Sequence, residues 1–216
     1  MEIQASGNVF VIATATGTVT ATGASAPNGY GVAATPDGST VYVASYNNAG
    51  VIVINPATNA VIGTIATGLG ARGLAVSPDG TRLYVSNRDS SSVSVVDIAT
   101  STVIGTVITA FPFGISVTPD GSKLYVANDV NSTVSVINTG TNTVIGTIPV
   151  GSNPSAFGTF IQPLPRFAGT PGTKNCHGVS VSALASKYGS LNAAAAAFGF
   201  AKVQGLQDAI RAFCGS

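Results

Sequence analysis

Short apolar runs alternate with polar turns along most of the chain, and this alternation predicts β-strands joined by tight connections. In one unit the runs cover residues 31–35, 41–45, 51–55 and 61–64. The second run is apolar at most positions, as expected for a strand covered on both faces. The third and fourth runs are rich in Val, Ile and Thr, which pack well on a pleated surface. The unit is therefore predicted to be a four-stranded antiparallel sheet.

This unit recurs twice more, with corresponding first strands starting near residues 73 and 114. A Pro-Asp-Gly turn marks each copy, at Asp37, Asp79 and Asp120, so the repeat is roughly 42 residues long. Pro fixes φ, Asp caps the turn and Gly accepts a positive φ, which together favour a tight hairpin. Four short strands per repeat predict the blades of an all-β propeller. A lone blade cannot cover both of its faces, so the blades must stack around a common axis.

The two ends of the repeat region are predicted to form one further blade. Residues 8–12 align with a third strand and residues 18–22 with a fourth, while residues 1–5 suit a clipped second strand. Downstream, residues 154–161 match a first strand. Pairing of the first and last strands completes this blade and removes the exposed edges.

Four blade equivalents leave three arrangements open, namely closure within one chain, an eight-bladed ring shared by two chains, or a piece of a longer propeller. Closure by four blades alone requires strongly splayed sheets with bulky residues between them. The facing residues here are mostly Val, Ala and Ile, which favour flatter stacking. We therefore expect a homodimer that completes one ring.

The element Tyr-Val-Ala/Ser-Asn/Ser follows each Pro-Asp-Gly turn and precedes Val-Ile-Gly-Thr, at residues 42–45, 84–87 and 125–128. In this element and its spacing, residues 1–163 resemble the YVTN-repeat propellers of bacteria and archaea. The resemblance implies a propeller fold and an exported protein, often at the cell surface. Members commonly have more blades than this chain provides, and they share no catalytic motif, so the resemblance implies no particular reaction.

Composition changes at residues 162–165, and a Pro- and Gly-rich linker is predicted over residues 164–174. Residues 175–216 are predicted to form a small helical segment, with helices at 180–188, 190–197 and 203–213. Cys176 and Cys214 bracket this segment, and a disulfide between them would stabilise it by about 4 kcal/mol. A metal site of Cys176, His177 and Cys214 is the alternative, but it lacks a fourth ligand. We predict the disulfide and no metal.

Charged residues make up 8% of the chain and the formal net charge is +1. No basic stripe is available for phosphates, so a nucleic-acid partner is not expected. No apolar run reaches the roughly 18 residues of a membrane span, and the first residues lack the regions of a signal peptide. Uncharged Thr-, Ser- and Asn-rich strands and the cysteine pair favour a secreted, periplasmic or cell-surface protein whose leader is absent from this chain.

Few residues suggest catalysis. His177 is the sole histidine, and no Gly-x-Ser-x-Gly motif supplies a nucleophile for it to activate. Asp37, Asp79 and Asp120 recur like a carboxylate cluster, but each belongs to a hairpin turn, which accounts for it. The glycine-rich stretches precede no helix and so match no phosphate or dinucleotide loop. We expect no cofactor.

One set of positions varies while the scaffold around it repeats. These positions stand where the first strands begin or where the second strands end, and in an up-and-down sheet both lie on one face. Loops on a rigid scaffold commonly carry binding groups, and Tyr and Arg combine large contacts with a polar end. Solvated loops without a binding role are the alternative. The predicted ligand-binding residues are Tyr30, Arg72, Phe113, Tyr46, Arg88 and Asp129.

Two functions remain open. The lack of an acid–base pair, a metal set or an activated nucleophile favours a non-catalytic binding or interaction module for an unknown small molecule, glycan or protein. The alternative is a hydrolase or lyase acting on a small ester or lactone at the mouth of the propeller channel, by analogy of fold. For such chemistry, Asp89, Asp129 and Asn128 are the plausible metal ligands in loops.

Overall fold

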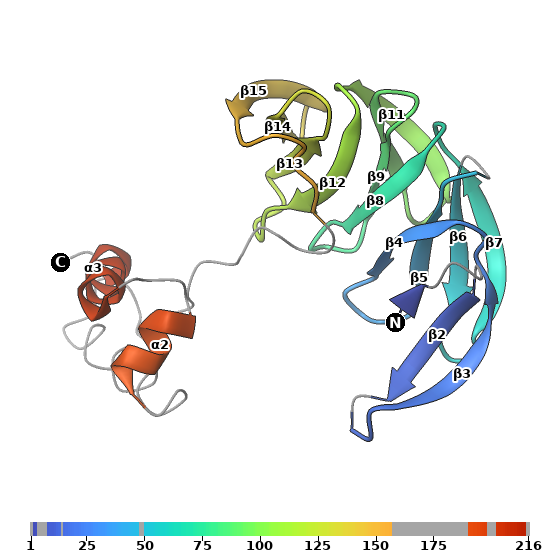
Figure 1. Cartoon of the computed structure of the whole chain (residues 1–216), viewed down its shortest axis with the longest axis horizontal. Coiled ribbons are helices and arrows are strands. Elements are labelled where there is room, and N and C mark those ends of the chain that lie inside the picture. Colours follow the sequence, from blue (N-terminus) through green and yellow to red (C-terminus); the bar gives the residue numbers. More distant parts are fainter. Residues whose placement is uncertain are drawn as a thin grey trace. The chain divides into compact units, whose positions relative to one another are not determined.

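A computed structural model describes residues 2–3, 8–13, 15–47, 50–156, 190–197 and 202–214. The chain divides into two compact units, Met1–Gln162 and Pro163–Ser216. The first unit is a series of antiparallel β-sheets that follow one another in sequence order, and the second contains helices (Figure 1). The predicted fold class is confirmed: four-stranded blades of a β-propeller, followed by a helical segment.

Each of the repeated sheets is a meander in which neighbouring strands are also neighbours in sequence. Blade 1 has three described strands, which correspond to the predicted clipped second strand and the third and fourth strands. Blades 2 to 4 each have four strands. Blade 1 comprises β1 (Glu2–Ile3), β2 (Asn8–Ala13) and β3 (Thr18–Ser25). Blade 2 comprises β4 (Gly29–Ala34), β5 (Val41–Ser45), β6 (Gly50–Asn55) and β7 (Ala60–Ala66). Blade 3 comprises β8 (Ala71–Val76), β9 (Arg82–Asn87), β10 (Ser92–Asp97) and β11 (Thr102–Ile108). Blade 4 comprises β12 (Pro112–Val117), β13 (Lys123–Asn128), β14 (Thr133–Asn138) and β15 (Thr143–Pro149).

The hydrophobic core lies between blades, not within any one of them. Tyr42 of blade 2 is buried in a cluster with Leu74 and Leu83 of blade 3. At the equivalent position, Tyr84 of blade 3 is buried with residues of blade 4. Tyr125, in the last described blade, is only partly buried. In blades 2 and 3, the tyrosine of the repeated element therefore packs against the following blade.

Neighbouring innermost strands approach so closely that only glycine fits between them. A Cβ atom added to Gly73 of β8 would lie 2.5 Å from the carbonyl oxygen of Phe113 in β12. Gly31 faces the carbonyl of Arg72 in the same way, and Gly114 faces that of Ala156. Backbone atoms form these contacts, so a side chain there would force the blades apart.

In blades 2 and 4, the last residue of the second strand forms a hydrogen bond with the connection that precedes its blade. The Asn128 carbonyl oxygen accepts a 2.6 Å hydrogen bond from the Thr109 hydroxyl, and its amide donates to Thr133 and to Ser135. Ser45, the equivalent residue of blade 2, donates instead to the carbonyl of Pro27. Asn87, the equivalent residue of blade 3, donates to Ser92 and Ser94, but its Oδ1 atom is buried without a hydrogen-bond partner among the described residues.

The closing strand predicted over residues 154–161 falls mostly outside the described residues. Its described part, residues 154–156, is not a strand. The carbonyl of Ala156 meets Gly114 as the carbonyl of Phe113 meets Gly73. The chain therefore leaves blade 4 beside its innermost strand, and pairing of this segment with blade 1 stays a prediction.

The second unit contains α2 (Leu191–Ala197) and α3 (Val203–Cys214), two of the three predicted helices. The third, expected over residues 180–188, lies outside the described residues, as do the linker at 164–174, Cys176 and His177. The helices bury their own small core, formed by Ala194, Ala195, Leu206, Ile210 and Cys214. The disulfide thus stays a prediction. Among the described residues, no helix is long and apolar enough to cross a membrane.

The glycine contacts predict a sharp difference between two Gly→Ala substitutions. Gly73→Ala places its methyl group against the Phe113 carbonyl and is expected to lower the free energy of unfolding by at least about 2 kcal/mol. Gly63→Ala in β7 is the control, because nothing lies within 4 Å of its Cβ position. We expect that variant to stay within about 0.5 kcal/mol of the parent protein in urea unfolding. Equal losses in the two variants would contradict the close-approach argument.

Candidate functional site

The candidate site is built on the three innermost strands. Tyr30, Arg72 and Phe113 occupy the same position in β4, β8 and β12, directly before the close-approach glycines. Because those glycines let neighbouring backbones approach, the side chains before them come within reach of one another. The residues that follow the second strands lie near these side chains, and in blade 2 that residue is Tyr46.

Arg72 lies among three aromatic rings. Its Cζ atom is 4.7 Å from the ring centroid of Tyr30, 5.0 Å from that of Tyr46 and 4.5 Å from that of Phe113. The rings of Tyr30 and Tyr46 are themselves 5.6 Å apart and tilted by 54°. Aromatic faces attract a cation, and a planar guanidinium stacks on them. We call these four residues the Arg72 stack.

The guanidinium of Arg72 has no acidic neighbour in the described part of the chain. No hydrogen bond or ion pair joins it to a described residue, and its Nε atom is buried without a partner there. A guanidinium carries five N–H donors in a flat fork that fits carboxylate and phosphate groups. Aromatic rings stabilise the positive charge but accept few hydrogen bonds. The N–H donors of Arg72 can therefore bind an acceptor that the described residues do not supply.

Arg88 occupies the position of Tyr46 in the next blade and is neutralised by neighbours. Its Nη2 lies 3.2 Å from Oδ2 of Asp129, and its Nη1 lies 3.5 Å from Oδ1 of Asp89. The Phe111 ring is 6.0 Å from its Cζ. Thus four of the six predicted ligand-binding residues form the Arg72 stack, and the other two form an ion pair across blades 3 and 4.

Sequence reasoning did not single out Phe111 for this face. It directly precedes β12, has a φ of 46° and is 39% exposed. A large aromatic residue with a positive φ is unusual. Its place one residue before the Pro-Phe pair that starts an innermost strand was the signal available in the sequence.

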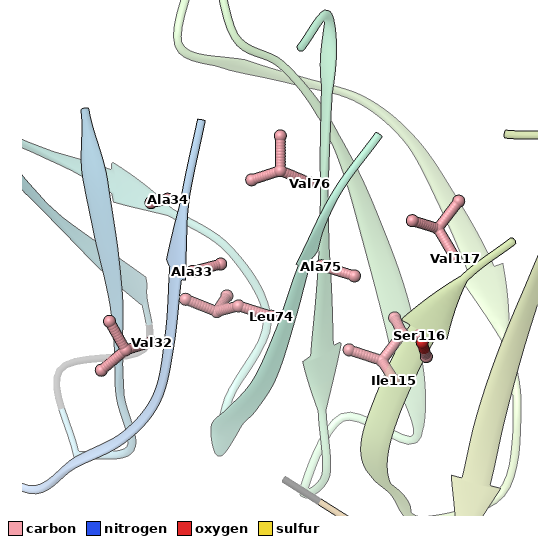
Figure 2. Close-up of a pocket in the computed structure, with 9 residues that line it drawn as sticks. All are labelled: Val32, Ala33, Ala34, Leu74, Ala75, Val76, Ile115, Ser116 and Val117. Atoms are coloured by element: carbon pink, nitrogen blue, oxygen red, sulfur yellow. The ribbon is translucent and has the colours of Figure 1, made fainter. Parts of the chain in front are cut away.

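A cavity of about 310 Å³ runs along the innermost strands beyond the stack. Figure 2 shows that β4, β8 and β12 each contribute three consecutive residues to its wall. All of them are uncharged, and all but one are apolar. Arg72 and the first wall residue of its strand, Leu74, are two positions apart, about 7 Å along a strand. The lining residues are Val32, Ala33, Ala34, Leu74, Ala75, Val76, Ile115, Ser116 and Val117.

The aspartates of the Pro-Asp-Gly turns are explained by turn chemistry. The Asp120 carboxylate accepts hydrogen bonds from the Thr118 hydroxyl and from the amide and hydroxyl of Ser122. These bonds, with that from Thr118 the strongest, lower the pKa of Asp120 to about 2. The pKa values of Asp37 and Asp79 are lowered from the same causes. Each carboxylate closes its own hairpin, so the structural interpretation of the three residues is confirmed.

The residues considered as metal ligands do not form a metal site. The side chain of Asn128 is fully used in its buried hydrogen bonds. Asp89 and Asp129 both face Arg88. Within the described ranges, no three His, Cys, Asp or Glu residues are grouped so as to hold a metal ion.

Antiparallel four-stranded blades stacked face to face, with innermost strands lining a channel wall, define the chain as a β-propeller protein. The family model described as "Lactonase, 7-bladed beta-propeller" matches residues 38–144, which cover most of blades 2 to 4. Among solved structures, hydrazine synthase from Kuenenia stuttgartiensis is similar, with 32% sequence identity and a TM-score of 0.57. That likeness covers 59% of this chain and 38% of the other, so this chain spans well under half of that structure's length. No curated protein matches the sequence.

Proposed function

We propose that this propeller is a non-catalytic binding module whose site is the Arg72 stack, and that the stack binds an anionic group. The observation that carries the proposal is the environment of Arg72, a cation held among three aromatic rings without an acidic partner among the described residues. A carboxylate or sulfate on a small molecule or glycan would supply the missing acceptor. Bidentate pairing of such a group with arginine is both strong and directional.

Arg88 supports this interpretation by contrast. It stands on the same face and has the same chemistry, but Asp129 and Asp89 already neutralise it. Arg72, by contrast, has no such aspartate beside it among the described residues. An arginine without an acidic partner among the described residues, positioned by rigid strands and flanked by rings, suits ligand binding.

A second candidate function is hydrolysis of a small lactone at the same face. The family model matched by residues 38–144 leaves this alternative open, because its printed description names a lactonase. Ring opening would produce a carboxylate, and Arg72 suits that product. The reaction also needs an activated nucleophile or a metal. Asp89 and Asp129 would have to leave Arg88 to serve either role.

We further propose that the protein is exported and that two chains share one ring. The low charge, the Thr- and Ser-rich strands and the two cysteines support export. Cys214 is buried in the small helical core, where a disulfide to Cys176 would add stability that two short helices lack. The partial burial of Tyr125 in blade 4, against its buried equivalents in blades 2 and 3, suits a further blade at that end.

Anion binding to the Arg72 guanidinium predicts a change in its Nε–H signal in two-dimensional NMR spectra. Acetate, glucuronate and sulfate are expected to shift this signal saturably, whereas glucose leaves it unchanged. Arg72→Gln should weaken binding at least tenfold, as expected for loss of a charged hydrogen-bonding partner. Arg82→Gln removes the same charge from a residue that pairs with Asp97, and it should bind like the parent protein. Anion binding that survives Arg72→Gln, or a signal that no anion moves, would refute the site.

The lactonase alternative predicts measurable turnover of γ- and δ-lactones of small hydroxy acids by the purified protein. Acid release at constant pH reports the reaction, with and without added divalent metal. If the alternative holds, Asp129→Asn should reduce the rate at least a hundredfold, the usual scale for a catalytic acid or base. Asp97→Asn serves as the control, because that carboxylate pairs with Arg82. A rate equal to the buffer blank under all these conditions would discard hydrolysis.

The assembly proposal predicts a solution mass near twice 21.3 kDa and an intact chain mass that rises by two hydrogens on reduction. Reduction should lower the melting temperature of the helical unit and leave that of the propeller unchanged, because the helices bury their own core. Light scattering and mass spectrometry make the two measurements. A compact monomer would rule out the shared ring, and an unchanged mass on reduction would rule out the disulfide.

A further inference from the structure

We propose that the Arg72 stack takes a small amphiphilic carboxylate, with the carboxylate on Arg72 and an apolar tail along the wall of β4, β8 and β12. The inference rests on the proposed function, since it needs Arg72 to bind an anion. The new element is the apolar tail of the ligand, which the proposed function does not specify. The observation behind it is that one strand, β8, carries both Arg72, which has no acidic partner among the described residues, and three of the uncharged residues that line the cavity.

The position of the wall fixes where the tail would lie. Arg72 and Val76 are four positions apart in β8, about 13 Å along an extended strand. The cavity of about 310 Å³ follows the last three residues of this stretch, together with the matching residues of β4 and β12 (Figure 2). Pockets for small ligands begin at about this volume. A ligand with its head on Arg72 therefore meets the wall with its next few carbon atoms.

The wall residues that are not fully buried present apolar surface to the cavity. Val32, Val76 and Val117 are partly buried, and Ala34 is exposed. Ala34, Val76 and Val117 occupy equivalent positions in their three strands, so they form one apolar level around the channel. None of the described residues that line the cavity is charged. A tail that covers this level removes apolar surface from water, both its own and that of the wall.

Other classes of small ligand fit only half of this arrangement. A short anion binds Arg72 but leaves the apolar wall exposed to water. A neutral alcohol covers the wall but supplies no negative charge to the guanidinium. A cationic amphiphile is repelled by Arg72. Only a molecule with an acidic head and an apolar tail is complementary to both parts.

The test is a tail-length series of acetate, butyrate, hexanoate and octanoate, titrated by calorimetry and by the Arg72 Nε–H signal. Each added methylene should tighten binding about two- to fourfold until the wall is covered. Octanol and octyltrimethylammonium, which have the same tail, should bind at least tenfold more weakly than octanoate. Equal affinity along the carboxylate series would overturn the inference and leave the anion site intact. Failure of every anion to move the Arg72 signal would instead reject the proposed function.

Two substitutions separate the tail contacts from the head contact. Ala34→Asp puts a carboxylate on the exposed end of the wall and should reduce octanoate binding to the level of acetate, with acetate itself little affected. Ala60→Asp makes the same change at an exposed position of the outer strand β7 and should leave the whole series unchanged. Circular dichroism confirms that both variants are folded. Equal effects of the two substitutions, or octanoate binding unaffected by Ala34→Asp, would place the tail elsewhere.

Discussion

The close approach of successive innermost strands is the constraint on which the other features of the propeller depend. At Gly73, the backbone of one blade lies against the Phe113 carbonyl of the next. The Ser86 hydroxyl secures the same contact, because it accepts a 2.7 Å hydrogen bond from the Gly73 amide and donates one of 2.7 Å to that carbonyl. With the backbones this close, the tyrosines between blades are buried and the residues before the glycines stack on one another. A larger residue at the glycine position would disturb the core and the site together.

The chain uses a repeated scaffold to carry a site that does not repeat. Turn aspartates, close-approach glycines and inter-blade tyrosines recur because each blade must solve the same packing problem. The positions just before the glycines are not fixed by this packing requirement. They hold tyrosine, arginine and phenylalanine in three successive blades, and so the symmetric scaffold gathers unlike side chains around one point. Arg72 is the cation at that point, and its aromatic neighbours come from the blades on either side.

The binding and lactonase hypotheses assign the same role to Arg72 and differ in the role of two aspartates. Both use Arg72 as the anchor for an acidic group, either of a ligand or of the product of ring opening. They differ over Asp89 and Asp129, which the structure pairs with Arg88. An ion pair lowers the availability of a carboxylate as a base or metal ligand. This pairing is the reason that we propose binding, and the family match leaves hydrolysis open.

The sequence by itself determined the blades, their strands and even the truncated sheet at the start, because strand periodicity and Pro-Asp-Gly turns are local properties. It also predicted that the six variable positions share a face, since equivalent positions of a repeat lie at the same height. Only the tertiary structure decided their partners. Arg88 pairs with Asp129, 41 residues away, while Tyr46 at the equivalent position turns to Arg72. Such choices depend on the distance between blades and on side-chain direction, and neither is encoded within a single repeat.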